Sequence, residues 1–216
     1  MDSSDVCFLP AHEMLDMVRR REISATELLD CHLNQIAKVN SNINAIVTLD
    51  EEQAKATAQD IDKRLGAKNH VGILEGLPVA HKDLTVTKGL KTTFGSPIFK
   101  DFVPDQDALI VDRLKRSGAI TIGKTNTPEF GAGSQTFNEV FGATRNPYNF
   151  EKTCGGSSGG AAAALSSGLV ALADGSDLGG SLRNPASFCN VVGLRPSAGR
   201  VPTWPTPAAW VSLSVL

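Results

Sequence analysis

Apolar residues in the first third of the chain recur at the spacing of helices. Met14, Leu15 and Val18 follow Pro10 and predict a short amphipathic helix. Ser24 and Glu27 form an S-x-x-E capping box, which predicts that a second helix begins there. The apolar and semi-polar positions that continue this helix are Leu28, Leu29, His32, Leu33, Ile36 and Val39.

A third helical pattern follows two acidic residues. Its apolar positions are Ala54, Ala58, Ile61 and Leu65. The preceding Glu51 and Glu52 favour a helix start, because a helix N-terminus carries partial positive charge. Residues 43–49 lie between the second and third helices and predict a strand.

From Gly76 onward the pattern changes to short apolar runs separated by glycine and proline. It predicts strands over 77–80, 119–122, 169–172 and 191–194, and helices over 107–117 and 161–169. Strands that alternate with helices indicate an α/β fold, which we expect to be a mixed β-sheet flanked by α-helices. We divide the chain into an N-terminal helical segment, 1–75, that packs on an α/β core, 76–216, and expect one structural domain.

Composition and charge exclude several classes of function. The net charge is −2 and the basic residues form no cluster, which argues against a nucleic-acid partner. No apolar run reaches the roughly 18 residues of a membrane span, and the N-terminus lacks the pattern of a signal peptide. The four cysteines are widely spaced, which favours reduced thiols and a cytoplasmic location over a zinc site. Cys154 lies in a glycine-rich segment and is the only candidate for a nucleophilic cysteine.

Glycine placement points to the part of the chain that carries chemistry. Of the 20 glycines, ten lie between Gly155 and Gly199, where they alternate with serines. Glycine is most useful where the backbone needs a positive φ or must approach a ligand closely. This segment is therefore the predicted site.

One alternative is a nucleotide site. Residues 118–125 match the P-loop pattern G-x₄-G-K-[ST]. A P-loop follows a strand and opens a helix, whereas here a predicted helix precedes the motif and the residues inside it predict a strand. Pro128 also disfavours helical backbone at Thr127. We therefore read this stretch as a strand that ends in a turn.

A second alternative is an α/β-hydrolase, because residues 155–159 satisfy G-x-S-x-G. That fold requires a histidine after the serine, but the last histidine is His81. A histidine-first order with His81 as base for Ser181 stays open. His81 adjoins Lys82, however, and neighbours on a strand point to opposite faces, so only one of them is expected to reach the site.

A lysine base is the third option. Lys82 directly follows an apolar strand, so its amine is expected to lie inside the protein. Burial disfavours the charged form of a lysine and lowers its pKa, which makes the amine a usable base near neutral pH. Serine nucleophiles activated by lysine are an established solution.

The segments around these residues resemble the amidase-signature family, over essentially the whole chain. The matching motifs are GLPVAHKD at 76–83, GKTNTPEF at 123–130, GGSSGG at 155–160, GSDLGGSLRNPA at 175–186 and CNVVGLRPS at 189–197. The spacing agrees as well: Lys82 and Ser157 are 75 residues apart, and Ser157 and Ser181 are 24 apart.

The resemblance implies a Lys–Ser–Ser triad. Ser181 would attack an amide carbonyl and form an acyl-enzyme, with Lys82 as base and, for the departing amine, as acid. Ser157, in a cis peptide, would pass protons between them. The substrate-binding elements implied are the loop at Gly131–Gly133 on the acyl side and an oxyanion hole from the backbone N–H groups of Leu178, Gly179, Gly180 and Ser181.

Further implied roles are structural. Ser158 would support the site, and Asp177 with Arg183 would hold the nucleophile loop by a charged pair. The resemblance implies an amidohydrolase that acts on a small-molecule amide without metal or organic cofactor.

Two alternatives stay open at this point. One is the glutaminase subunit of a tRNA-dependent amidotransferase, although 127–130 and 177–180 look more like stand-alone amidases. The other is an inactive fragment, because family members continue well beyond residue 216 with more sheet and helix. An edge exposed there would need a homo-oligomer or the missing C-terminal half as a partner.

Overall fold

The computed structural model describes residues 3–67, 72–206 and 215. Its N-terminal part is helical, as the apolar spacing predicts. The helices are α1 (Ser3–Val6), α2 (Ala11–Arg20), α3 (Ala25–Ile43) and α4 (Glu51–Gly66). The capping box at the start of α3 is formed, since Ser24 Oγ accepts from the Glu27 N–H and Glu27 accepts from the Ser24 N–H. Helix α3 extends to Ile43, so the strand predicted over 43–49 begins only at Ile46.

A four-stranded sheet follows in the order β1-β3-β2-β8. Its strands are β1 (Ile46–Leu49), β2 (Pro78–Lys82), β3 (Ile120–Thr125) and β8 (Leu172–Ala173). Strand β1 runs antiparallel to β3, whereas β2 runs parallel to both β3 and β8. The sheet is therefore mixed, which confirms the predicted fold class.

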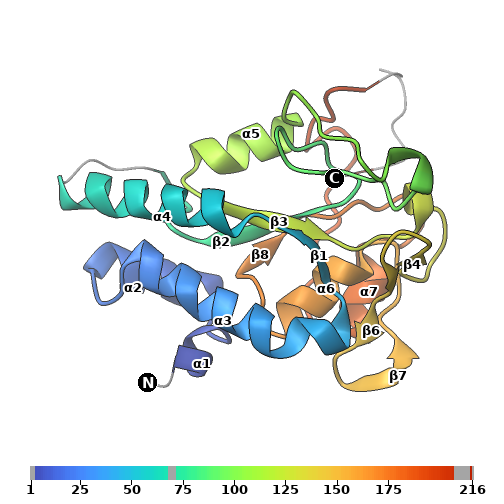
Figure 1. Cartoon of the computed structure of the whole chain (residues 1–216), viewed down its shortest axis with the longest axis horizontal. Coiled ribbons are helices and arrows are strands. Elements are labelled where there is room, and N and C mark those ends of the chain that lie inside the picture. The colour runs from blue at the N-terminus through green and yellow to red at the C-terminus, as the bar shows by residue number, and fades with distance from the viewer. Residues whose placement is uncertain (1–2, 68–71, 207–214, 216) are drawn as a thin grey trace.

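Helices cover both sides of this sheet (Figure 1). Helix α5 (Leu109–Arg116) lies on one side, and α2, α3 and α6 (Gly159–Ser166) lie on the other. Helix α4 packs against both α3 and β3. The main hydrophobic core joins residues of the predicted N-terminal segment, such as Leu29 and Ile61, to Ile120 and Ala163 of the predicted α/β core. The two segments thus share one core.

The chain also forms short elements that the apolar pattern did not predict. One 3-10 helix lies before α5, and the other short elements lie between α5 and α6. They are 3-10 helices at Pro97–Phe99 and Glu129–Gly131, and strands β4 (Phe137–Asn138), β5 (Gly142–Ala143), β6 (Arg145–Asn146) and β7 (Asn149–Thr153). Strands β4 and β5 form one hairpin, and β6 and β7 form another. Helix α7 (Arg183–Phe188) follows β8.

The strand predicted over 191–194 is wrong. These residues are irregular, and Val192 and Leu194 are exposed. The apolar run resembles a buried strand in sequence, yet in the described residues the sheet ends at β8 and the run does not pair with that edge. The strand predicted over 169–172 is likewise reduced to Leu172–Ala173. No helix in the described ranges is long and apolar enough to cross a bilayer.

Candidate active site

The side chain at the centre of the site is Lys82, at the carboxyl end of β2. It is completely buried, and its Nζ points to the side of the sheet on which α6 begins. Burial lowers the pKa of Lys82 from 10.5 to about 7, although the carboxylates of Asp174 and Asp177 act in the opposite direction. Near neutral pH this lysine is therefore present in both its charged and its neutral form, as a base requires.

Three serine hydroxyls surround the Lys82 amine. Nζ donates to Ser157 Oγ at 2.7 Å, to Ser158 Oγ at 2.9 Å and to Ser176 Oγ at 3.0 Å. An ammonium has three donors, so these three acceptors satisfy it fully. When the amine is neutral, one of the three bonds reverses and a serine becomes the donor. The Gly156–Ser157 peptide is cis, as the resemblance implies.

Ser181 lies on the neighbouring loop and is more accessible to solvent than Ser157. Ser157 is buried, whereas Ser181 is partly exposed, as an attacking group must be to meet a substrate. The two serine loops are tied together by the Ser158 N–H, which donates to the Ser181 carbonyl oxygen at 3.1 Å. The described residues show no hydrogen bond between the hydroxyls of Ser157 and Ser181. Of the triad, the structure thus brings Lys82 and Ser157 into direct contact and Ser181 beside them.

The predicted oxyanion loop offers three of its four N–H groups. The Gly180 N–H is already used, because it donates to Asp177 Oδ1 at 2.8 Å. The N–H groups of Leu178, Gly179 and Ser181 have no acceptor among the residues described. Leu178 and Gly179 are also exposed.

Asp177 organises this loop, as predicted. Its buried carboxylate accepts two hydrogen bonds of 3.0 Å from the Arg183 guanidinium, and Arg195 adds a third contact at 3.3 Å. The Leu182 N–H donates to the same carboxylate at 3.0 Å. Burial alone would raise the pKa of Asp177, but these donors hold it well below its usual range. The loop is therefore fixed around a permanent anion.

Gly131 lies next to the serine bonded to the lysine. A Cβ built on Gly131 would be 3.6 Å from Ser157 Oγ and 2.7 Å from Leu84 Cδ1, and φ at this glycine is +72°. The structure thus places the predicted acyl-side residue beside the predicted relay. Larger side chains are unfavourable at this position for both steric and conformational reasons.

The structure does not support the P-loop or the nucleophilic cysteine. Lys124 of the P-loop match is fully buried and donates to the carbonyl of Thr85 and the hydroxyl of Thr87. It lies inside strand β3, which continues to Thr125, so the lysine does not open a helix as a P-loop lysine does. Cys154 is buried, and burial raises its thiol pKa to about 11, which leaves the thiol protonated and unreactive near neutral pH.

His81 lies on the other face of β2, as strand alternation predicts. Its Nδ1 is 2.6 Å from Asp174 Oδ2 and its Nε2 is 3.0 Å from Thr121 Oγ1. The imidazole is therefore engaged away from the serines, and a role as base for Ser181 is not supported by its contacts.

A family model described as Amidase matches residues 27–216 of the chain. The chain belongs to the amidase family. Among curated proteins, a glutamyl-tRNA(Gln) amidotransferase subunit from Bacillus velezensis is 47% identical over 189 residues, which are 88% of this chain and 39% of the relative. The corresponding protein from a Geobacillus species is 48% identical over 190 residues, with the same coverage. The chain therefore spans about two fifths of the length of these relatives.

Solved structures of the amidase family share the fold. A bacterial aryl acylamidase superposes with a TM-score of 0.91 at 34% identity, over 96% of this chain and 43% of that one. A 6-aminohexanoate cyclic dimer hydrolase complexed with substrate gives 0.85 at 37% identity, over 94% and 40% of the two chains. The described sheet and helices thus correspond to a part of the amidase fold.

Two residues of this candidate site were not predicted from the sequence. Ser176 contacts the Lys82 amine, and Asp174 binds the Lys82 backbone N–H at 2.7 Å. Both precede Asp177 in the segment that leads to Ser181, so their closeness to the predicted nucleophile was the available signal. Nothing in the linear pattern indicated that an acidic residue directly after a strand would be fully buried.

Proposed function

We propose that this chain carries the catalytic centre of an amidohydrolase that cleaves a linear carboxamide through an acyl-enzyme on Ser181. The observation that carries the proposal is the buried amine of Lys82, with a pKa lowered to about 7 and a hydrogen bond of 2.7 Å to Ser157 Oγ. A buried neutral amine beside a serine is arranged to accept a proton, and a partly exposed serine adjoins it.

In the proposed reaction, Ser181 Oγ attacks the carbonyl carbon of the amide and passes its proton to Ser157. Ser157 in turn passes its own proton to the neutral Lys82 amine. The oxygen of the tetrahedral intermediate takes up negative charge, which the free N–H groups of the 178–181 loop stabilise. Loss of one such donor costs a factor of about 10²–10³ in other serine hydrolases.

Collapse of the intermediate breaks the C–N bond. The Lys82 ammonium returns its proton through Ser157 to the departing nitrogen, which leaves as an amine or ammonia. The product is an ester between the acyl group and Ser181. Water then attacks this ester with the same relay in the same order, which releases the carboxylate and restores the serine.

The nucleophile is tested by labelling with a fluorophosphonate and mapping the labelled peptide. We expect modification of Ser181, loss of labelling in Ser181→Ala and full labelling in the matched control Ser187→Ala, an exposed serine on α7. Circular dichroism would first establish that each variant is folded. Labelling of another residue in the folded protein would refute the assignment of the nucleophile.

A second candidate function is glutamine hydrolysis within a tRNA-dependent amidotransferase. It is favoured by the 47–48% identity of this chain to amidotransferase subunits among the curated proteins. An assay that offers L-glutamine and 4-nitroacetanilide in parallel separates the two. Release of 4-nitroaniline without ammonia from glutamine supports the stand-alone amidase, and the opposite result supports the glutaminase.

The substrate pocket and its partners are also part of the proposal. A groove of about 390 Å³ runs along the edge strand β8 between α6 and α7, lined mostly by apolar residues that include Leu172 and Val191. In a protein as long as the relatives, we expect further sheet, or a partner, to cover this edge. An inactive fragment, the remaining alternative, predicts that Ser181 stays unlabelled in the folded chain. A cytoplasmic location is proposed from the cysteines, all four of which are free thiols.

A further inference from the structure

A buried pair, His81 and Asp174, lies directly behind the lysine and has no part in the proton relay. The His81 side chain is on the face of β2 opposite the serines, and Asp174 follows the edge strand β8. Both side chains are shielded from solvent, with exposed fractions of 0% and 4%. Burial of a charged residue is costly unless its partners are well placed, so the pair calls for a specific role.

Asp174 is connected to the lysine through the backbone. Its Oδ1 accepts from the Lys82 N–H at 2.7 Å and from Thr85 Oγ1 at 3.2 Å. Its Oδ2 is 2.6 Å from His81 Nδ1. One carboxylate therefore fixes the last residue of β2 and the turn that follows it.

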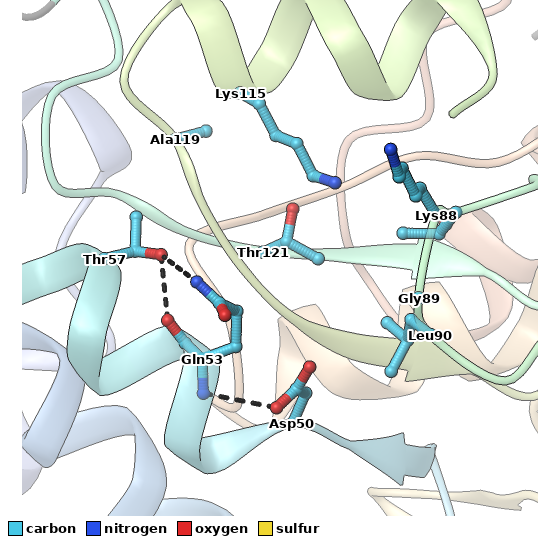
Figure 2. Close-up of a pocket in the computed structure, with 10 residues that line it drawn as sticks. Asp50, Gln53, Thr57, Lys88, Gly89, Leu90, Lys115, Ala119 and Thr121 are labelled. Atoms are coloured by element: carbon cyan, nitrogen blue, oxygen red, sulfur yellow. Dashed lines mark hydrogen bonds between the residues drawn. The ribbon is translucent and has the colours of Figure 1, made fainter. Parts of the chain in front are cut away.

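The pair continues to the far side of the sheet. Thr121 Oγ1, 3.0 Å from His81 Nε2, lines a cavity of about 560 Å³ between α4 and α5. Figure 2 shows Thr121 on the floor of this cavity, with Lys88 and Lys115 above it. A continuous chain of hydrogen bonds thus runs from Thr121 through His81 and Asp174 to the backbone of Lys82.

The charge of Asp174 is a permanent one. Burial by itself raises the pKa of Asp174, but His81, the Lys82 N–H and the charge of Lys124 together lower it below its ordinary value. An ionised carboxylate only accepts hydrogen bonds, so His81 Nδ1 carries the proton in their contact. The other charge that acts on the Lys82 amine is Asp177, which Arg183 and Arg195 already pair. Of the two carboxylates that act on the Lys82 amine, Asp174 is therefore the one that no arginine of the described residues neutralises.

We propose that Asp174, held by His81, is a positioning residue for Lys82: it fixes the lysine backbone at the end of β2, and its negative charge favours the ammonium form of the amine. The proposal rests on the proposed function in one respect, that Lys82 is the base. It assigns no contact with substrate to either residue. Its consequence is that removal of the Asp174 charge lowers the pH at which the base becomes neutral.

The test is Asp174→Asn, which keeps the shape and an acceptor for the Lys82 N–H but removes the charge. Heteronuclear NMR of the ¹³Cε and ¹⁵Nζ nuclei of lysine, with the Lys82 signal assigned from Lys82→Met, reports the pKa of the amine directly. Loss of a nearby opposite charge should lower this pKa by about one unit. The acidic limb of the kcat/KM profile for 4-nitroacetanilide should move to lower pH by the same amount.

Asp62→Asn is the matched control. Like Asp174, Asp62 accepts hydrogen bonds from backbone N–H groups and a threonine hydroxyl, here from Ala25 and Thr26 at the start of α3. It should change stability without moving the Lys82 titration. Asp174→Glu, which retains the charge, should restore the original titration.

A purely structural role for Asp174 predicts a different outcome. In that case, folded Asp174→Asn would lose activity at all pH values while the Lys82 titration stayed in place, and the proposal would be overturned. If the new amide does not suit His81 and the variant fails to fold, the double variant His81→Leu/Asp174→Asn removes the unmatched imidazole and should show the same shift. A titration unchanged in that variant overturns the proposal equally.

The NMR measurement does not depend on turnover. A lowered Lys82 pKa in a protein that hydrolyses no amide would support the positioning role and count against the proposed function. Hydrolysis of an amide by the wild type, with an unchanged Lys82 titration in Asp174→Asn, would support the proposed function and count against the positioning role.

Discussion

Replacement of Lys82 by methionine tests the central claim, that the amine is held partly neutral inside the protein. Burial lowers its pKa from 10.5 to about 7. Between these values the unfolded chain binds a proton that the folded chain does not, so the stability of the wild type rises with pH. One pKa unit corresponds to about 1.36 kcal/mol. From pH 7 to pH 10 the wild type should therefore gain roughly 3–4 kcal/mol in stability relative to Lys82→Met, which lacks this titration.

Comparing the two proteins at several pH values separates the titration of Lys82 from contributions to stability that do not depend on pH. Lys82→Met also leaves the buried Ser157 hydroxyl without its lysine partner, at a cost of about 1–3 kcal/mol. That cost offsets part of the gain from removing a buried amine, but it does not depend on pH. Only the change with pH in the difference between the two unfolding free energies reports the titration of Lys82.

The assay is urea unfolding of both proteins at pH 7, 8, 9 and 10, with Lys63→Met as the control. Lys63 is an exposed lysine of α4, and its replacement should give a curve parallel to the wild type. Parallel curves for Lys82→Met as well would mean that the Lys82 amine titrates alike in the folded and the unfolded chain. The reasoning that makes it a base would then be refuted.

Three further predictions follow from the same geometry. The kcat/KM for amide hydrolysis should rise with pH around an apparent pKa near 7, because only neutral Lys82 accepts a proton; a profile flat from pH 5 to 9 would contradict this. Gly131→Ala should lose about 1–2 kcal/mol in urea unfolding, because φ is +72° and a neighbouring side chain lies 2.7 Å from the new Cβ, whereas Gly66→Ala on open surface should not. Iodoacetamide should modify half-buried Cys31 before the other three thiols, measured by peptide mass spectrometry, and faster labelling of buried Cys154 would revive the cysteine nucleophile.

The sequence predicted the elements that hold the core, because their apolar residues are periodic. The start of α3 was predicted to the residue, since the Ser24 capping box is a local interaction. The two hairpins after residue 136 were missed because their strands are two to five residues long, and all five residues of β7 are exposed. The apolar run over 191–194 was misread, because pairing depends on a neighbouring strand that the run itself cannot specify.

In the site, too, residues within local motifs were predicted, whereas residues that depend on contacts between distant segments were not. Lys82, Ser157 and Gly131 were found from motifs and lie together in the structure. Asp174 and Ser176 were not found, because their importance depends on which strand lies beside β8. Of the four N–H groups predicted for the oxyanion hole, that of Gly180 turns inward to Asp177, a choice that only the folded loop can specify.

The separation of the lysine from its partners along the chain has a consequence for folding. Lys82 is 75 residues from Ser157 and 92 from Asp174, and the contacts that bury its amine need β8 in place beside β2. Contacts of such long range form late, because the entropy of closing long loops must be overcome first. We expect the amine to stay solvated and protonated until the last parallel strand docks. Its deprotonation would then mark completion of the sheet, as a released proton that refolding experiments with a pH indicator could time.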